Sequence, residues 1–550
     1  MINLKNAKKS MYLLTAIVLL STSLSGCMDS SNQSTKSDPI PNEEPDVSRF
    51  IVAVEEEPDT VDFQCTSIHY TVAQNVFDRL VEMVNNSHGS AVVLPSLAKS
   101  WEVSDDGMTY TFHLREGVTF SNGSPLTASD VLYTFSRLLT HPDSCNQDIV
   151  DIIAGADKLQ SGETDQLEGF KILGDLDFSI TLSEPFAAFL PCLSMPGASI
   201  MDEETTTEAG DRFGADPEWT IGTGSFILWK WSKGEGMLLK ANKNCWNGAP
   251  KCEGLDLRFL LDEKEMEALF EKGELDVLDL DKIGDDADKY LNDDSYKSRL
   301  LRAHPVGITY IVLNESVEPL NDVSVRKALQ LALDREELMD ISLKGRAILE
   351  QGIFPHGLNG YNEDLPEISY DPDSAEKLLA EAGYKDGFEM TISVKNTAYP
   401  WEKAMMQDVA AMWSKIGVKA TVEIIDEAEW MKLRKSGKLA CYEATWIADY
   451  NDPDNFIYTF FGSKENTTFR SLCYPREDIM KRVRDARGII NKDERIKEYR
   501  DLEQTIIQDD AAWIPLFSRL RYYVQGERAN GLKASWNGSI KNNYRNMSIK

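Results

Sequence analysis

The chain has 550 residues, which is too many for one hydrophobic core and predicts two or three domains. With 42% hydrophobic and 27% charged residues the composition is that of a globular protein, but 90 acidic against 58 basic residues give a formal net charge of -32. This charge argues against nucleic-acid binding, which depends on clustered lysine and arginine, and is typical of a soluble, acidic, exported protein. The alternative interpretation of this charge is that its electrostatic field favours cationic ligands.

The N-terminus has the features of a lipoprotein signal peptide. Three lysines precede an apolar stretch, Met11 to Leu24, which is too short for an ordinary membrane span. The stretch ends in Leu24-Ser-Gly-Cys27, which resembles the lipobox of bacterial lipoproteins. We therefore expect residues 1–27 to be the signal peptide, Cys27 to be lipidated, and the polar residues 28–48 to form a flexible tether. Lipid chains would then anchor the protein at the extracytoplasmic face of the cell membrane.

Seven cysteines follow Cys27, so at least one is free or pairs between molecules. Only Cys245 and Cys252 are close in sequence, and they flank a turn-rich loop that a disulfide could close. The sequence leaves open whether this pair is bridged.

The first half of the chain mixes short strands with helices. We expect a buried strand at residues 50–54, a hairpin of residues 101–103 and 110–114, and a second hairpin of residues 226–231 and 237–240. Thr127-Ala-Ser-Asp130 fits a capping box and predicts a helix through Leu138. The region from about residue 80 to 210 is predicted to form a separate part.

The second half alternates more regularly between strands and helices, which predicts a mostly parallel sheet with right-handed crossovers. The expected strands are residues 310–313, 388–394, 420–425, 439–447 and 513–517, the last returning the chain toward the first lobe. The expected helices are residues 325–332, 371–383, 401–416, 428–436, 456–461 and 493–508.

The stretch Glu443 to Asn455 is acidic and lies where a predicted strand passes into a predicted helix. Ligands bind at the carboxyl ends of strands in open α/β sheets, so we expect Asp449 to face a ligand. Asp452 and Asp454 are expected to cap the following helix.

Five sequence blocks resemble the bacterial extracellular solute-binding proteins of the oligopeptide and dipeptide class. They are residues 94–103, 105–118, 222–226 with 242–250, 321–329, and Trp446-Ile-Ala-Asp-Tyr-Asn-Asp-Pro-Asp-Asn-Phe456. The resemblance implies an α/β, two-lobed, periplasmic-binding-protein-like fold with the ligand cleft between the lobes. It divides the chain into lobe I (49–79, 212–303 and 518–550), an extra domain of lobe I (80–211) and lobe II (304–517).

The resemblance also implies a function and a site. The protein would capture peptides as a monomer without catalysis and deliver them to the permease of an ABC importer. Asp449 would pair with the peptide ammonium, and Trp446 and Tyr450 would lie in the same site. The residues that hold the carboxylate in relatives are replaced: Glu443 stands for an arginine and Trp401 for a histidine.

Arg434 matches an arginine of the oligopeptide binders and is the remaining cationic candidate, with a solvated helix end as its alternative. Glu443 and the acidic balance suggest a bias toward peptides with basic side chains. A metal site is not predicted, because the six histidines have no ligand spacing, and no cofactor is expected. The alternatives are the same fold with a nickel chelate, haem or peptide signal as ligand, and an extracellular hydrolase, whose motifs are missing.

Overall fold

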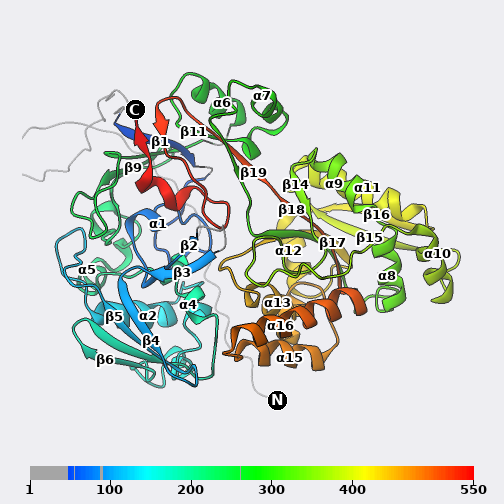
Figure 1. Ribbon diagram of the computed structural model, residues 1–550, viewed down its shortest axis with the longest axis horizontal. Coiled ribbons are helices and arrows are strands. Elements are labelled where there is room, and N and C mark those ends of the chain that lie inside the picture. The colour runs from blue at the N-terminus through cyan, green and yellow to red at the C-terminus, as the bar shows by residue number, and fades with distance from the viewer. Residues whose placement is uncertain (1–47, 55, 87–90, 261) are drawn as a thin grey trace, which may run out of the picture. The chain divides into compact units, whose positions relative to one another are not determined.

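The computed structural model describes residues 48–54, 56–86, 91–260 and 262–550 (Figure 1). The expected signal peptide 1–27, the lipidated Cys27 and nearly all of the tether 28–48 lie outside the described residues. Within the described part of the chain, no helix combines the length and the apolar character that a membrane span requires.

The first large sheet has seven strands in the order β12-β19-β11-β1-β10-β9-β8. Their bounds are β1 Arg49–Val54, β8 Phe226–Ser232, β9 Gly236–Ala241, β10 Gly254–Phe259, β11 Val277–Asp279, β12 Leu300–Ala303 and β19 Arg521–Gln525. β1 runs parallel to β10 and β11, and the other neighbours are antiparallel. One face of the sheet packs on a core that contains Phe50 and Leu255, and the other on a core that contains Ile51 and Val524. The predicted strand 50–54 and the hairpin of β8 and β9 are confirmed.

The predicted extra domain contains a separate antiparallel sheet, β4-β5-β7-β6. Its strands are β4 Ala98–Val103, β5 Thr109–Leu114, β6 Phe170–Gly174 and β7 Asp177–Thr181, and a further hairpin pairs β2 Val81–Asn85 with β3 Ala91–Pro95. Helix α2 (Ala128–Thr140) begins at the predicted capping box, in which Asp130 accepts hydrogen bonds from the backbone and hydroxyl of Thr127. The shorter helices of this half are α1 Ala73–Val76, α3 Ala156–Ser161, α4 Phe189–Cys192, α5 Glu203–Ala209, α6 Glu263–Glu271 and α7 Ala287–Asn292.

The second large sheet carries the predicted site, and its strands are all antiparallel, in the order β14-β18-β13-β17. They are β13 Gly307–Leu313, β14 Ala347–Leu349, β17 Cys441–Ile447 and β18 Trp513–Arg519. The expectation of a mostly parallel sheet is therefore wrong. β13 pairs with strands that lie more than a hundred residues further along the chain, and the alternation of neighbouring elements does not determine the direction of such distant partners. Only β15 (Phe388–Lys395) and β16 (Val418–Ile425) form the expected parallel pair.

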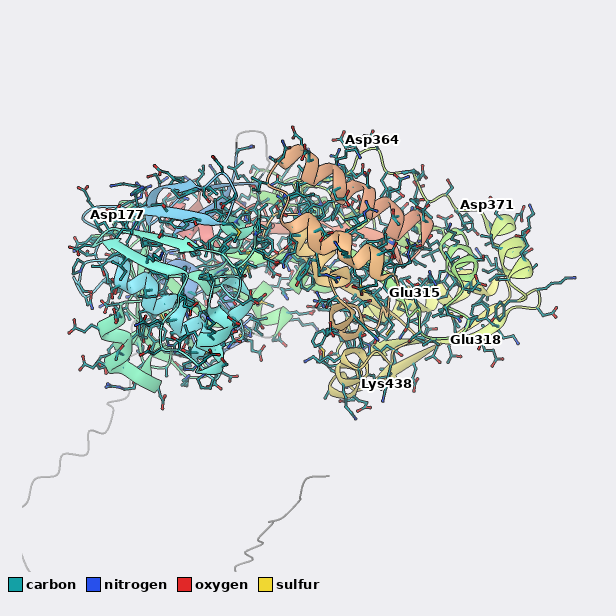
Figure 2. All side chains as sticks on the ribbon, turned by 90° about the horizontal axis from the view of Figure 1, so that it is seen from below. Asp177, Glu315, Glu318, Asp364, Asp371 and Lys438 are labelled. Carbon is teal, nitrogen blue, oxygen red and sulfur yellow. The ribbon has the colours of Figure 1, made fainter. Side chains whose placement is uncertain are left out.

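The helices of the second half are α8 Val323–Leu331, α9 Arg335–Leu343, α10 Pro372–Glu381, α11 Pro400–Ser414, α12 Glu427–Lys435, α13 Asp454–Phe461, α14 Lys464–Phe469, α15 Glu477–Arg487 and α16 Lys492–Gln504. Six of these helices follow the expected ones, and the other three, α9, α14 and α15, were not predicted. Asp371, labelled in Figure 2, caps α10 by accepting a hydrogen bond from Ser374 N. The expected helix 493–508 is α16 followed by a π-helical turn, Thr505–Asp509.

The chain passes between the two large sheets twice. The first passage lies between Ala303, the end of β12, and Gly307, the start of β13. The second lies between Arg519 and Arg521, so β18 belongs to the second sheet and the passage comes two residues after the expected boundary 517/518. It is β19, and not the strand at 513–517, that joins the first sheet.

The loop between β17 and α13 is fastened by a buried ion pair, and breaking it should destabilise the fold. Arg495 Nη1 and Nη2 donate to the two carboxylate oxygens of Asp452 at 2.8 and 2.7 Å. Because Asp452→Ala leaves a buried guanidinium without its partner, we expect it to lower the free energy of unfolding by about 3–5 kcal/mol. A fall in the thermal midpoint measures this. Lys481→Ala, which breaks an exposed pair with Asp485, is the matched control and should leave the midpoint unchanged, as exposed pairs contribute little.

Candidate functional site

The candidate site is the loop that connects β17 to α13. Along β17 the side chains of Tyr442 and Ala448 are buried, whereas those of Thr445, Ile447 and Asp449 are exposed, so the strand presents one face to the core and one to solvent. At the end of the strand, Ala448 N donates to Val306 O at 2.8 Å, which ties the loop to the first passage between the sheets.

Asn455, in the first turn of α13, fixes the position of Asp449. Its Oδ1 accepts from Asp449 N at 3.0 Å and from Trp446 Nε1 at 3.2 Å, while its Nδ2 donates to Asp449 Oδ2 at 3.2 Å. Asn455 itself is buried. One buried amide therefore orients both the aspartate and the tryptophan of the motif and leaves the outer oxygen of the carboxylate open to solvent.

Protein groups crowd the Asp449 carboxylate enough to desolvate it in part, and we call these surroundings the recess. The pKa of Asp449 is raised from the usual value, first by burial and further by the charge of Asp148, while Asn455 and Arg470 act in the opposite direction. The side chain is nevertheless open to solvent. A carboxylate that is partly desolvated and still reachable is suited to bind a cationic group, because pairing restores the interaction energy lost to desolvation.

Tyr70, in the first half of the chain, stands near this carboxylate. The pKa of its hydroxyl is raised by burial, and the charge of Asp449 adds to the shift. Its hydroxyl donates to Thr66 O at 2.7 Å and Asn146 Oδ1 at 3.1 Å. The charge of Asp449 is thus felt by a residue of the first half of the chain.

Tyr450 does not face the recess, and its expected place in the site is wrong. Its side chain is 9% exposed, and its hydroxyl donates to Asp454 Oδ2 at 3.0 Å. Asp454 also accepts from Arg487 Nε at 3.1 Å, so it forms a buried ion pair instead of a helix cap. Asp452 does accept from Asp454 N, as a capping residue would, but its main partner is Arg495.

Glu443 and Arg434 line one pocket of about 270 Å³, between β15, β17, α11 and α12. Burial and the charge of Glu402 raise the pKa of Glu443 to about 8, against Lys395, Arg519 and Thr445, which lower it. The carboxyl group is therefore mostly neutral at pH 7, and it cannot act as a fixed anion for a basic ligand. The structure thus brings Glu443 and Arg434 to one pocket at the outer end of β17.

Trp401 does not line that pocket, although its neighbour Glu402 does, and it lies near the second passage between the sheets. The Arg519 guanidinium lies 4.7 Å from the centre of its ring. The same guanidinium pairs with Asp281 at 3.3 Å. Because Asp281 follows β11, this pair joins the end of β18 to the half of the chain that contains the first large sheet. Trp401 thus supports an interaction between the two halves.

Cys245 and Cys252 are both free and buried, so the structure contradicts a disulfide between them. Their sulfurs have different surroundings. Cys245 Sγ lies 3.8 Å from Thr223 O and 3.9 Å from Ser225 Oγ, whereas Cys252 packs into the core beneath the first sheet. The loop between them is held without a bridge.

Sequence reasoning missed Asn455, Tyr70 and Arg470. Asn455 stood inside the quoted motif, and the signal that could have found it is the amide six residues after the aspartate. Arg470, at the end of α14, lies with its guanidinium 5.7 Å from the Trp446 ring and 4.8 Å from the Phe460 ring. No local pattern places Tyr70 or Arg470 here, because both arrive through long-range folding.

Comparison with known proteins gives a consistent result. The family model described as bacterial extracellular solute-binding proteins, family 5 Middle, matches residues 92–468. The chain is 30% identical to Heme-binding protein A of Haemophilus influenzae, over 84% of each chain. It is 29% identical to the dipeptide-binding protein of Escherichia coli, over 86% of this chain and 89% of the relative. The structure of HbpA2 from Haemophilus parasuis superposes with a TM-score of 0.75 at 27% identity, covering 91% of this chain and all of that one.

Removing the Asn455 amide, which bridges Asp449 and Trp446, should weaken ligand binding while preserving the fold. We expect Asn455→Ala to reduce the affinity for the natural ligand by about tenfold, because Asp449 and Trp446 lose their shared partner and regain rotational freedom. Calorimetric titration measures the change. Asn466→Ala, which removes an amide donating to Tyr458 O at 2.8 Å in the same lobe, is the control and should leave affinity unaltered. Equal losses in the two variants would contradict the role given to Asn455.

Proposed function

We propose that the protein captures peptides outside the cytoplasm for an ABC importer, and the premise is its family: the chain belongs to the bacterial extracellular solute-binding proteins, family 5. The fold is the two-lobed α/β fold of its structural neighbours. Proteins of this family bind solutes rather than transform them. Relatives named as dipeptide-binding proteins in Escherichia coli and Pseudomonas aeruginosa match more than four fifths of the chain and support a peptide as the solute.

The observation that carries the proposal is the geometry of Asp449. Its carboxylate is reachable and partly desolvated, and it accepts a hydrogen bond from Asn455 Nδ2, while Asn455 Oδ1 accepts from Asp449 N and Trp446 Nε1. A free peptide ammonium is the group that this arrangement fits, since an ammonium donates up to three hydrogen bonds and neutralises the charge. Trp446, oriented by the same amide, supplies an aromatic wall beside it.

The finer features of the proposal rest on the N-terminal sequence and on the family. Cys27 would carry the lipid that holds the protein at the outer face of the cell membrane, and the tether 28–48 would let the binding lobes reach the permease. We propose that the protein acts as a monomer. Its acidic charge would keep it dispersed in solution.

Haem is the second candidate solute, favoured by the likeness to Heme-binding protein A. Adding haem to the purified protein and recording the visible spectrum tests it. A shift of the haem absorption band that is reversed by adding peptide would support a shared site. An unchanged haem spectrum, together with measurable peptide binding, would rule out haem and leave peptides as the proposed solute.

Asp449→Asn is the first variant to measure. It keeps the shape and the hydrogen bonds of the site but removes the charge, so we expect affinity for tri-alanine to fall by about 2–5 kcal/mol, as when one partner of a desolvated charge pair is lost. Calorimetry with tri-alanine measures this. N-acetyl-tri-alanine, which has no ammonium, should bind both proteins equally weakly. Asp478→Asn, an exposed aspartate, is the control. Retained affinity in Asp449→Asn would refute the ammonium site.

Peptide affinity should also depend on pH through Asp449. The ammonium binds the ionised carboxylate, so the bound state has the lower Asp449 pKa, while the free protein has a raised one. Affinity is therefore full above the raised pKa and is lost as pH falls through it, with proton release on binding in that range. The peptide amine, with a pKa of about 8, stays charged there. Calorimetry in two buffers of different ionisation enthalpy measures the protons, and in Asp449→Asn the release should disappear.

A further inference from the structure

We infer that Arg434 and Arg470 together form a subsite for a carboxylate group of the ligand, next to the Asp449 recess. This inference rests on the proposed function and deepens it, because it states what holds the other end of the ligand. It replaces the cationic groups that relatives use and that are missing here at Glu443 and Trp401.

The two guanidinium groups share an aromatic contact. Both lie over the ring of Phe469, Arg434 at 5.5 Å and Arg470 at 5.7 Å from its centre. Arg434 also lies 5.7 Å from the ring of Trp430, and Arg470 lies against Trp446 and Phe460. Stacking on rings fixes the plane of a guanidinium while leaving its N–H groups available at the edge.

Neither arginine has an ionic partner among the residues that the structure describes. Arg470 Nη1 donates only to Asn466 O, at 3.4 Å, and Arg434 Nε is buried without an acceptor. The Tyr442 hydroxyl lies beside Arg434, but it carries no charge. Other arginines of this half are satisfied within the protein. Arg326 pairs with Glu315, which Figure 2 labels, Arg487 pairs with Asp454, and Arg495 pairs with Asp452. Arg335 has no carboxylate partner, but its guanidinium donates to three backbone carbonyls and to Gln351 Oε1.

Two neighbouring cations without a counterion are costly, and this cost points to an anionic ligand. Burial lowers the pKa of Arg470, and the charge of Arg434 lowers it further. The chain has 90 acidic residues, so a carboxylate partner could be supplied from within, as it is for Arg326, Arg487 and Arg495. A ligand carboxylate would satisfy both groups, since guanidinium and carboxylate pair through two parallel hydrogen bonds.

The subsite lies beside the ammonium site rather than at a separate place. The charge of Asp449 acts on Arg470, and the Trp446 ring that Arg470 contacts is oriented by the Asn455 amide that holds Asp449. Arg434 lines the pocket that also contains Glu443. Because the Glu443 carboxyl is mostly neutral at pH 7, it does not cancel the charge of Arg434. The expected bias toward basic side chains therefore gives way to a bias toward ligands that carry both an ammonium and a carboxylate.

The carboxylate can come from the C-terminus of a short peptide or from an acidic side chain, and four probes separate these sources. Tri-alanine is compared with tri-alanine amide, and Ala-Glu-Ala amide with Ala-Gln-Ala amide, by calorimetry at neutral pH. We expect the wild type to prefer the acidic member of at least one pair by about 10- to 100-fold. In Arg434→Gln and Arg470→Gln we expect this preference to shrink to about twofold, through loss of affinity for the acidic member alone.

Arg470→Lys keeps the charge and should retain part of the preference, which a merely structural role of the side chain would not explain. Arg482→Gln, at an arginine paired with Glu498 on the surface of the same lobe, is the control and should behave as the wild type. Equal affinities within both pairs for the wild type would overturn the subsite. The subsite would also be overturned if Arg434→Gln and Arg470→Gln proteins, unfolding at the wild-type temperature, kept the full preference for the acidic peptide of each pair.

Failure of the peptide proposal has a different signature. If no probe binds the wild type, the ligand that co-purifies with the protein, seen by native mass spectrometry, decides the question. A retained ligand that lacks any anionic group would overturn the subsite. A retained anionic non-peptide that is missing from the Arg470→Gln protein would refute the peptide proposal and support the subsite.

Discussion

The three hydrogen bonds of Asn455 to Asp449 and Trp446 are the interaction on which the rest of the site depends. A carboxylate that loses part of its hydration and finds no cation in the protein raises the energy of the folded state, so the surrounding structure must hold it in place. Asn455 can do so because α13 begins within a rigid loop. That loop is fastened by two buried ion pairs, Asp452 with Arg495 and Asp454 with Arg487. The three aspartates of this loop therefore have different roles. Asp449 is available to the ligand, whereas Asp452 and Asp454 hold the loop in place.

Charge is distributed in the same way across the site. Arg326, Arg487 and Arg495 are paired with carboxylates, and the buried Arg335 donates to four uncharged oxygens instead. Asp449 and the arginines Arg434 and Arg470 have no direct ion pair among the residues that the structure describes, which leaves an anionic and a cationic position open to a ligand. A zwitterionic ligand would complete both at once. Specificity then comes from the ends of the ligand, and side chains between the ends are less constrained, which suits a protein that takes many peptides.

Local sequence patterns predicted elements well and their arrangement poorly. The capping box at Thr127, the cap at Asp371 and the strand before Asp449 were readable because each depends on neighbours within a few residues. The direction of the sheet around β13 was not readable, since it depends on pairing with β17 and β18, far along the chain. For the site, the motif predicted Asp449 and Trp446. It misplaced Tyr450, because alternation alone does not reveal that a residue just beyond the strand turns inward to Asp454. The place of Arg470 depends on the contacts that the end of α14 makes with Trp446 and Tyr442 of β17, which no spacing in the sequence encodes.

The position of the site relative to the two passages between the sheets explains why the loop sits where it does. β17 pairs with β13, and β13 begins at the first passage; β18, its other neighbour, ends at the second. Ala448 N is hydrogen-bonded to Val306 O within the first passage, and Arg519 joins Trp401 to Asp281 at the second. Asp449 is therefore tied through its neighbour Ala448 to the first passage, and a rotation of the two halves about the passages would leave it with the second sheet. Such a rotation would change the distance from Asp449 to Tyr70 and Asp148 but not to Asn455. A ligand held by Asp449 and contacted by the first half thus favours one relative position of the two halves, and binding energy is coupled to their closure by geometry alone.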